Sequence, residues 1–593
     1  MEDFNLVLKR KLFVLASALF IAGGILSSDA KTLLLVPQDN RPVSLSYTVS
    51  TATKAGYTVL TPPDAYLSGK NYQGSPDLIW QWVDRNIGKA DAAILSTDTL
   101  IYGGLVDSRK HNESLETLEN RADRIRTLHR RFPSVPIYAF GTIMRTPYAS
   151  SGGVEPYYYT SYGTSLYRIS ALQDKMDIGT ISNAETAELL SLKLSVPSEY
   201  LQDWYKRRTK NTIINRKLIE DTREGVFAYF CKGHDDNSKN SQSALESRYL
   251  TKDAKGLSPK IYGSFPGADQ LALLLIARYH NDANHLKPTF SVIYPLGREE
   301  DTVPSYENQP IGKTIEEHVI AAGGTIIKKN TPDIMLAVNT PLVSTGESGT
   351  FSNYGMMKQS TTDFMNQVDS IIDRGIPVAM VDVYFANGSD NTLMKLMQKH
   401  DILYKVAAYD GWNTASNTIG FAIAQAILAP DMSAQDHKDM LTEQYLDNWA
   451  YQANIRKDIT RMCESQHTNY IPTPDIKEEM IAEVQDFAKR KLGLNPATVS
   501  ADFPWNRLFE IDAKVSPNPI YPVYMTQAAK RLKEEQEAAR KLKEAQEQQK
   551  AKAESASVPV QAKGSNVSEG TDISTVYINL SLIHISEPTR PLY

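Results

Sequence analysis

The stretch Thr32–Ser44 reads TLLLVPQDNRPVS, a short apolar run followed at once by a proline, three polar side chains and an arginine. A run of this kind, bounded by turn residues, is typical of a strand buried in a parallel sheet. The same pattern returns at Ala92–Ser96 and at Pro136–Gly141, each time before a polar loop. Repetition of strand, polar loop and helix is therefore the feature from which we infer the fold.

Similar short runs continue along the chain and alternate with longer helical patterns. Parallel sheets covered by helices produce such an alternation. We expect further strands at Tyr57–Leu60, Gly225–Phe230, Thr289–Tyr294, Asp333–Val338, Pro377–Val383 and Ile402–Ala408, and helices at Ser114–Arg131, Asn183–Lys193, Ala268–His280, Thr361–Asp373, Thr418–Ala429, Gln435–Ile455 and Ile476–Leu492.

The predicted fold class is α/β, with parallel strands alternating with helices in two units. Rossmann-like open sheets and barrel-like units both fit, because chain order does not reveal whether a sheet closes on itself. A C-terminal helical segment and a charged helical tail follow. The expected division is a secretory signal peptide at 1–30, an N-terminal α/β domain at 31–287, a second α/β domain at 288–433, a helical segment at 434–520, a charged solvated helix at 521–556 and a disordered tail at 557–593.

The N-terminus has the pattern of a secretory signal. A basic cluster at Lys9–Lys11 precedes the apolar run Leu12–Leu26 and the small residues of Ser27–Ala30, so we expect cleavage before Lys31. The apolar run is short for a membrane span, which needs about 20 residues, although an uncleaved anchor is the alternative. We therefore predict an exported protein, periplasmic, cell-envelope or secreted, with no transmembrane span after signal cleavage.

The C-terminal region changes composition. Ala528–Glu554 is rich in Lys, Glu, Gln and Ala with hardly any large apolar side chain, which predicts a solvated helix or spacer rather than a coiled coil. The following stretch has a disordered composition. Ser581–Tyr593 resembles the translation of a sequencing adapter, so we expect the authentic C-terminus to be missing.

Composition limits the kinds of partner. The chain has 593 residues, 64 basic and 69 acidic, with a net charge of −5, and this balance gives no reason to expect nucleic acid as a partner. A polar small molecule or a glycan fits better.

Cys231 and Cys463 permit one disulfide without requiring it, and His280 and His285 have no neighbouring cysteine, so no zinc site is expected. A carboxylate site for calcium or magnesium stays open. We predict no resident metal and no cofactor. No Walker loop, strand-to-helix GxGxxG or GxSxG elbow is present in the sequence, which argues against nucleotide-dependent, dinucleotide-dependent and serine hydrolase activities.

Polar clusters follow several predicted strands. In parallel α/β folds the loops beyond the carboxyl ends of the strands converge, and ligands bind there. Helix caps and turn hydrogen bonds explain any one cluster equally well, but their recurrence favours a shared polar site. The predicted ligand-binding residues are Asp39, Arg41, Asp98, Tyr102, Arg145, Asp269, Asn387, Trp412, Asn413 and Asn417.

The strings VPQDNRPVS, TDTLIYGGLVDSR, FPGADQ and YDGWNTASNTIG together resemble an uncharacterised bacterial family, domain-of-unknown-function family 4127. The resemblance extends from about Leu33 to Ala429. It implies an α/β fold and carries no established activity. The family pattern places Glu after the GAD string, and Gln270 stands there in this chain, so we expect no acid role for that position.

The adjacent pair Asp235-Asp236 is the predicted catalytic element. Two neighbouring carboxyls can separate their pKa values, so that one stays ionised while the other holds a proton for general acid catalysis. Glycosidases need two such carboxyls at one bond, and the pair is similar in type to the strand-end aspartates of substrate-assisted N-acetylhexosaminidases. The alternative is an ordinary surface turn. Neighbours on an extended strand point to opposite sides, so both serve one site only if the strand ends there.

We therefore expect an exported hydrolase, specifically a glycoside hydrolase acting on an envelope or environmental glycan. The first alternative is a non-catalytic envelope protein that binds a sugar or another polar ligand. A structural protein without a small ligand is the second. An enzyme or a binding protein needs these polar residues in one cleft, whereas a structural protein does not. Their positions in the fold therefore distinguish the alternatives.

Overall fold

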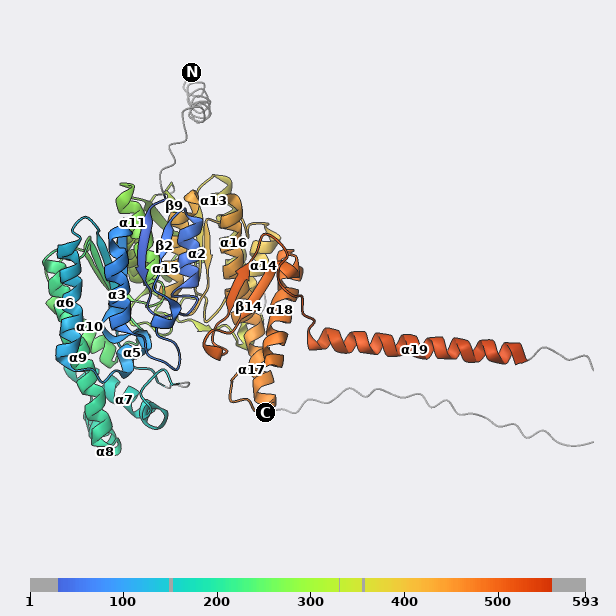
Figure 1. Cartoon of the computed structure of the whole chain (residues 1–593), viewed down its shortest axis with the longest axis horizontal. Coiled ribbons are helices and arrows are strands. Elements are labelled where there is room, and N and C mark those ends of the chain that lie inside the picture. The colour runs from blue at the N-terminus through green and yellow to red at the C-terminus, as the bar shows by residue number, and fades with distance from the viewer. Residues whose placement is uncertain (1–29, 149–152, 330, 355–357, 557–593) are drawn as a thin grey trace, which may run out of the picture. The chain divides into compact units, whose positions relative to one another are not determined.

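The computed structural model describes residues 30–148, 153–329, 331–354 and 358–556 (Figure 1). The described residues up to Thr526 form one compact unit, and those from Gln527 onward belong to a second. The described portion of the second unit is the helix α19 (Gln527–Ala556), which is exposed from Arg531 to Lys552, as its charged composition predicts. The predicted signal peptide, apart from Ala30, and the predicted disordered tail lie outside the described residues.

The first sheet has six strands, all parallel, in the order β2-β1-β3-β4-β5-β6. The second strand lies at one edge, outside the first, and the later strands are added in sequence on the other side. This is the order of an open doubly wound sheet. Its strands are β1 (Thr32–Val36), β2 (Thr58–Leu60), β3 (Ala92–Ser96), β4 (Ile137–Ile143), β5 (Tyr229–His234) and β6 (Tyr262–Pro266).

The second sheet repeats this topology with five parallel strands. Numbered within the sheet, its strands again have the order 2-1-3-4-5. The α/β fold class is confirmed, and both units have open Rossmann-like sheets rather than barrels. The strands are β7 (Thr289–Ile293), β8 (Thr325–Ile326), β9 (Ile334–Asn339), β11 (Val378–Asp382) and β13 (Ala408–Asp410), with a parallel pair, β10 (Gly346–Glu347) and β12 (Phe385–Ala386), and an antiparallel pair, β14 (Val499–Asp502) and β15 (Asp512–Val515), outside the sheet.

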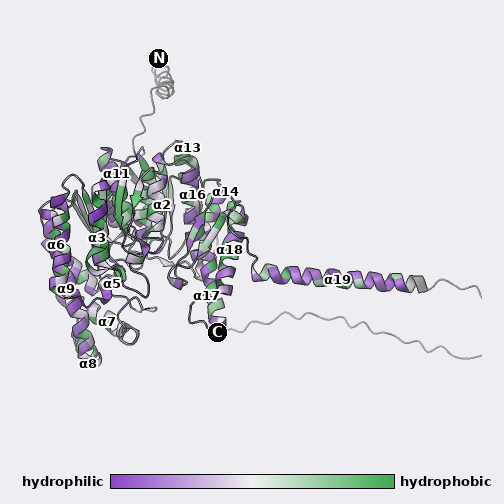
Figure 2. Ribbon diagram, in the orientation of Figure 1, coloured by the Kyte–Doolittle hydropathy of each residue, from purple (hydrophilic) through white to green (hydrophobic). Residues whose placement is uncertain are grey.

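Helices cover both faces of both sheets. Alternate residues of β1 show this, because Leu33 and Leu35 belong to one apolar cluster while Leu34 and Val36 belong to another. Figure 2 shows apolar strands inside and hydrophilic residues over outer helices such as α9. The helices are α2 (Ser46–Lys54), α3 (Pro76–Asn86), α4 (Thr97–Tyr102), α5 (Leu105–Lys110), α6 (Leu115–Arg131), α7 (Tyr159–Asp177), α8 (Asn183–Ser195), α9 (Ser198–Arg223), α10 (Gln242–Asp253), α11 (Leu271–Ala283), α12 (Ile311–Ala321), α13 (Gln359–Asp373), α14 (Asn391–Lys399), α15 (Ala415–Leu428), α16 (Ala434–Gln444), α17 (Arg456–Ser465) and α18 (Pro474–Leu492), with a π-helix, η7 (Tyr445–Ile455), between α16 and α17.

Helices α11 and α15 form a central layer shared by the two sheets. Every residue of α15 is buried, and α11 is buried from Leu271 to Asn281. One apolar cluster joins these helices to the inner faces of both sheets. At Gly420 of α15 an added Cβ would lie 2.2 Å from the side chain of Gln270, so the contact requires glycine. A helix that is apolar on all sides has to be covered on all sides, and here a sheet lies on each side of the layer.

Most predicted elements are observed with small shifts at their ends, and three predictions are wrong in a way that affects the site. The strand predicted at Gly225–Phe230 is β5, which lies at Tyr229–His234. The predicted strand Ile402–Ala408 is reduced to β13, which begins at Ala408. The single helix predicted at Gln435–Ile455 is α16 followed by a π-helix. Strand β6 was not predicted at all.

Within the described ranges no helix combines the length and the apolar composition that crossing a bilayer requires.

The central layer predicts which truncations unfold the protein. Leu275→Ala, in the middle of α11, should lower the free energy of unfolding by about 2–5 kcal/mol, because the cavity it leaves is enclosed by rigid neighbours. The matched control Leu194→Ala, at a leucine that is 88% exposed, should stay within about 0.5 kcal/mol of wild type. Urea denaturation followed by circular dichroism measures both. Equal effects of the two substitutions would contradict the shared core.

Candidate functional site

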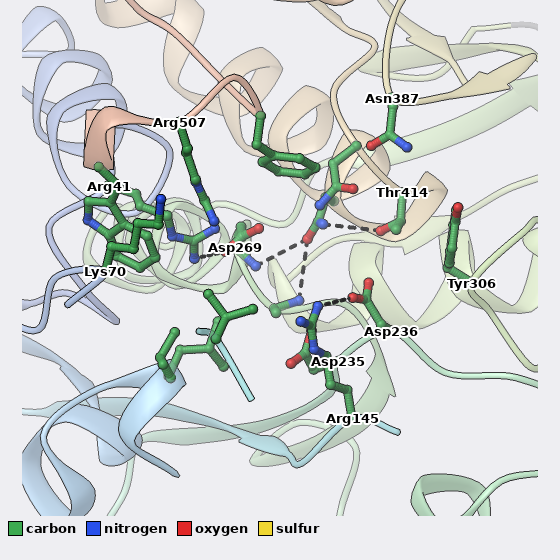
Figure 3. Close-up of a pocket in the computed structure, with 18 of the residues that line it drawn as sticks. Arg41, Lys70, Arg145, Asp235, Asp236, Asp269, Tyr306, Asn387, Thr414 and Arg507 are labelled. Atoms are coloured by element: carbon green, nitrogen blue, oxygen red, sulfur yellow. Dashed lines mark hydrogen bonds and ion pairs between the residues drawn. The ribbon is translucent and has the colours of Figure 1, made fainter. Parts of the chain in front are cut away.

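A cavity of about 550 Å³ opens where the carboxyl ends of both sheets meet (Figure 3). Helix α5 and the loops after β1, β2, β4, β5 and β6 supply one part of its wall, and the loops after β7, β12 and β13 supply another. Helix α17, the loop that follows it and the turn between β14 and β15 complete the wall. The polar and aromatic residues that line it are Arg41, Lys70, Arg109, Arg145, His234, Asp235, Asp236, Asp269, Tyr306, Asn387, Asn413, Thr414, Asn417, Arg456, Thr460, Asn469, Tyr470, Trp505, Arg507 and Phe509.

The aspartate pair lies at the point where β5 ends. The strand stops at His234, and Asp236 has a φ of 29°, which turns the chain out of the extended conformation. Both carboxyls can therefore line one cavity, as an extended strand would not allow. Asp235 is almost fully buried, at 6% exposure, whereas the side chain of Asp236 is 26% exposed.

Each aspartate of the pair has its own arginine. The Arg109 guanidinium donates to Asp235 at 2.5 Å, and the Arg145 guanidinium donates to Asp236 at 2.5 Å. Glu155 joins the two arginines, since its carboxylate lies 2.6 Å from Arg145 Nε and 3.4 Å from Arg109 Nη1. These five residues form a continuous charged chain along the wall. Such pairing offsets the cost of removing the charges from water and holds both carboxyls in place.

Burial raises the pKa of Asp236, and the negative charge of Asp235 raises it further, against the opposing effects of Arg145 and Arg109. Burial also raises the pKa of Asp269 to about 6, although Arg41 opposes this shift. A carboxyl whose pKa is raised retains its proton to higher pH, which suits general acid catalysis.

Arg41 links the first strand to the cavity. Its guanidinium donates to Asp39 at 2.8 Å through Nε and to Asp269 at 2.6 Å through Nη2. Asp39 is fully buried, and its other oxygen accepts the backbone N–H of Arg41 at 3.1 Å. Asp39 therefore positions Arg41 from behind, and Arg41 in turn orients Asp269.

Asn417 connects the loops of the two sheets. Its side-chain oxygen accepts the backbone N–H groups of Ala268 and Asp269, at 3.3 and 3.1 Å, and its amide donates to Thr414 at 3.1 Å. Asn417 lies in the first turn of α15, whose N-cap is Thr414. Beyond any local capping role, this residue holds the loop after β6 against the start of α15.

A family model described as "Protein of unknown function (DUF4127)" matches residues 33–514. The chain belongs to this family. The match confirms the resemblance inferred from the DNRPV and GWNT strings, and it contains every residue that lines the cavity. Searches of curated proteins and of solved structures found no match.

Eight of the twelve site residues predicted in this DUF4127 chain line the cavity, and four do not. Asp39 lies behind Arg41, as described. Asp98 is buried and accepts hydrogen bonds from the backbone and hydroxyl of Thr142, at 2.9 and 2.7 Å. Tyr102 stacks on His111, with ring centroids 5.0 Å apart, and Trp412 packs edge-on against Phe509. The residues that do line it are Arg41, Arg145, Asp235, Asp236, Asp269, Asn387, Asn413 and Asn417.

The part of the wall formed by α17 and by the segment before β15 was not predicted from the sequence. That region was predicted to be helical and without a site, but Trp505 and Asn506 have φ values of 58° and 48° and form a tight turn at the cavity. The sequence signal is the string PWNRLF at Pro504–Phe509, which combines aromatic residues with an arginine after a proline. Lys70 and Tyr306 also lie in long loops rather than at strand ends.

Asp269 predicts a pH dependence of stability. Its pKa is about 6 in the folded protein against 3.8 for an ordinary aspartate, so the native state retains this proton in a range where the unfolded chain has lost it. The carboxyl therefore lowers the free energy of unfolding as the pH rises between these two values. Asp269→Asn removes that effect, so its stability should improve relative to wild type as the pH rises through this window. Urea midpoints measured across the window test this.

The matched control for that series is Asp401→Asn, because Asp401 is exposed and has a φ of 54°, which asparagine tolerates. Its stability curve should run parallel to wild type. A parallel curve for Asp269→Asn as well would show that the Asp269 carboxyl does not titrate in this range.

Proposed function

We propose that this protein is an exported hydrolase that cleaves glycosidic bonds of an envelope or environmental glycan in the cavity at the joint carboxyl edges. The observation that carries the proposal is the pair Asp235 and Asp236, which line one cavity in different environments. Asp235 is buried against Arg109, and Asp236 is partly exposed with a raised pKa. Two carboxyls in unlike environments are what acid-catalysed hydrolysis needs.

The environments suggest a role for each member of the pair. Asp236 donates its proton to the glycosidic oxygen as the bond to the anomeric carbon breaks. Asp235, whose negative charge Arg109 stabilises, supports the positive charge that develops on the sugar. Water then adds to the anomeric carbon and returns a proton to Asp236, so that one water molecule is consumed for each bond cleaved.

The remaining wall suits a sugar. Asn413 presents a side-chain amide that can donate to and accept from hydroxyls, and the Asn387 amide oxygen can accept, while the Asn387 nitrogen donates to Glu347 and Asn417 holds the loop after β6. Tyr306 and Phe509 add aromatic surface, which packs against the apolar face of a sugar ring. The cavity volume of about 550 Å³ falls in the usual range for small-molecule sites. Trp412, which was predicted to supply such a face, lies behind Phe509 instead.

The decisive variant is Asp236→Asn, which keeps the shape of the side chain and removes its acidic proton. Release of reducing sugar from a glycan panel should fall by about a hundredfold or more, the range expected for loss of a general acid. Asp401→Asn is the matched control, since that aspartate is exposed and also has a positive φ. Unchanged turnover in Asp236→Asn would remove this residue from the mechanism.

The rate of hydrolysis should also depend on pH in a defined direction. As the pH rises through the elevated pKa of Asp236, the acid loses its proton, and kcat should fall on the alkaline side. The variant Arg145→Lys keeps the positive charge and loses the planar guanidinium. The pH profile of kcat should therefore shift while some activity is retained. A wild-type kcat that stays constant as the pH rises through the elevated pKa of Asp236 would contradict acid catalysis by Asp236.

A non-catalytic binding protein is the second candidate, and one observation favours it. Both aspartates are already in short ion pairs with arginines, and such pairs also serve to hold loops in place. Saturable binding of a glycan without turnover by the wild-type protein would support this candidate. Export is part of both proposals, and N-terminal sequencing of protein recovered outside the cytoplasm should find Lys31 as the first residue.

A further inference from the structure

One end of the cavity is lined by cations that the proposed acid chemistry does not use. Figure 3 shows Arg41, Lys70 and Arg507 gathered together, apart from Asp235 and Asp236. Arg41 and Arg507 both contact the ring of Trp505, with their guanidinium carbons 5.5 and 4.6 Å from the ring centroid. We call Lys70, Arg456 and Arg507 the cationic wall.

The members of this wall have few carboxylate partners. Arg507 pairs with Glu510 at 2.5 Å, but its Nε is buried with no hydrogen-bond partner. Arg456 donates to the amide oxygen of Gln452 at 2.9 Å and lies over the ring of Phe509. Among the described residues, Lys70 has no carboxylate within ion-pair distance, and Arg507 is the charged group that lowers its pKa.

The positive charges of the cationic wall are held close together and are not fully neutralised by carboxylates. Partial burial lowers the pKa of Lys70, and the nearby positive charge of Arg507 lowers it further. In contrast, Arg41, Arg109 and Arg145 each have at least two carboxylates. An anion that enters the cavity and accepts from Lys70 and Arg507 would offset the positive charges of both side chains.

We propose that the cationic wall binds an anionic group of the ligand, and that the hydrolase therefore acts on an acidic glycan. The sugar component of this inference rests on the proposed function, whereas anion binding does not. The ligand carries its hydroxyls toward the asparagines and its carboxylate, phosphate or sulfate toward Lys70 and Arg507. These three anions share one chemistry, a compact group of oxygens that accepts from a guanidinium and an ammonium.

The first experiment uses inorganic anions, which require no turnover. Phosphate, sulfate and acetate are titrated separately into the full-length protein, and binding is followed by calorimetry and by the thermal midpoint. We expect saturable binding in the millimolar range for at least one of them. Lys70→Gln and Arg507→Gln should each weaken it by about tenfold, and Lys70→Arg should restore most of it because the charge returns. Lys395→Gln, at an exposed lysine elsewhere, should bind as wild type.

The second experiment compares matched sugars. Glucose, glucuronic acid, glucose 6-phosphate and glucose 6-sulfate differ only in the anionic group, and the tightest ligand identifies which anion the wall prefers. Preference for an acidic sugar that is lost in Lys70→Gln supports the proposal. Equal binding of glucose and its acidic forms, or saturable anion binding that Lys70→Gln and Arg507→Gln leave unchanged, overturns it, as does the absence of any anion binding.

The two proposals fail in different ways. If the protein binds anions through Lys70 and Arg507 but no glycan is hydrolysed, the hydrolase is rejected and the cationic wall stands. If Asp236→Asn abolishes glycan hydrolysis while neutral and acidic glycans are cleaved equally, the hydrolase stands and the acidic substrate is rejected.

Discussion

The burial of two apolar helices between two parallel sheets is the constraint on which the rest of the structure depends. Helices α11 and α15 have no face for water, so each has to be enclosed by β-strands and neighbouring helices. The enclosing strands come from both sheets, and the helices begin at the cavity and run away from it. The carboxyl ends of both sheets are therefore brought to one place, and neither sheet alone would form the site.

The chemistry of the cavity depends on how its charges are paired. Burying a carboxylate is costly unless it is hydrogen-bonded and paired, and here Arg41, Arg109 and Arg145 supply the partners. Arg41 bridges Asp39 and Asp269. Arg109 and Arg145 pair directly with Asp235 and Asp236, and Glu155 links these two arginines. Burial raises the pKa of Asp236 and of Asp269, both of which line the cavity, although the arginines oppose these shifts. The cationic wall stands outside the network, so the two ends of the cavity differ in charge.

Much of the fold was predictable because most buried strands are continuous apolar runs. Strand β5 was predicted four residues too early in the chain, because it is buried although it contains the polar residues Lys232 and His234. Lys232 donates to Asn215 at 2.6 Å, and His234 lies 2.9 Å from Ser264 and 3.1 Å from Ser247. These partners come from α9, β6 and α10, so Lys232 Nζ and His234 Nε2 gain their hydrogen bonds only after the chain has folded.

The amino-acid sequence by itself determined the family, the alternation of strands and helices, and the polar loops at the strand ends, because these are local patterns of hydrophobicity and turn chemistry. Tertiary structure alone decided which loops meet. It placed Asp98, Tyr102 and Trp412 in the interior and brought Lys70, Arg456 and Arg507 to the cavity. Whether a polar residue caps its own turn or faces a ligand depends on contacts with residues hundreds of positions away, and local sequence does not encode them.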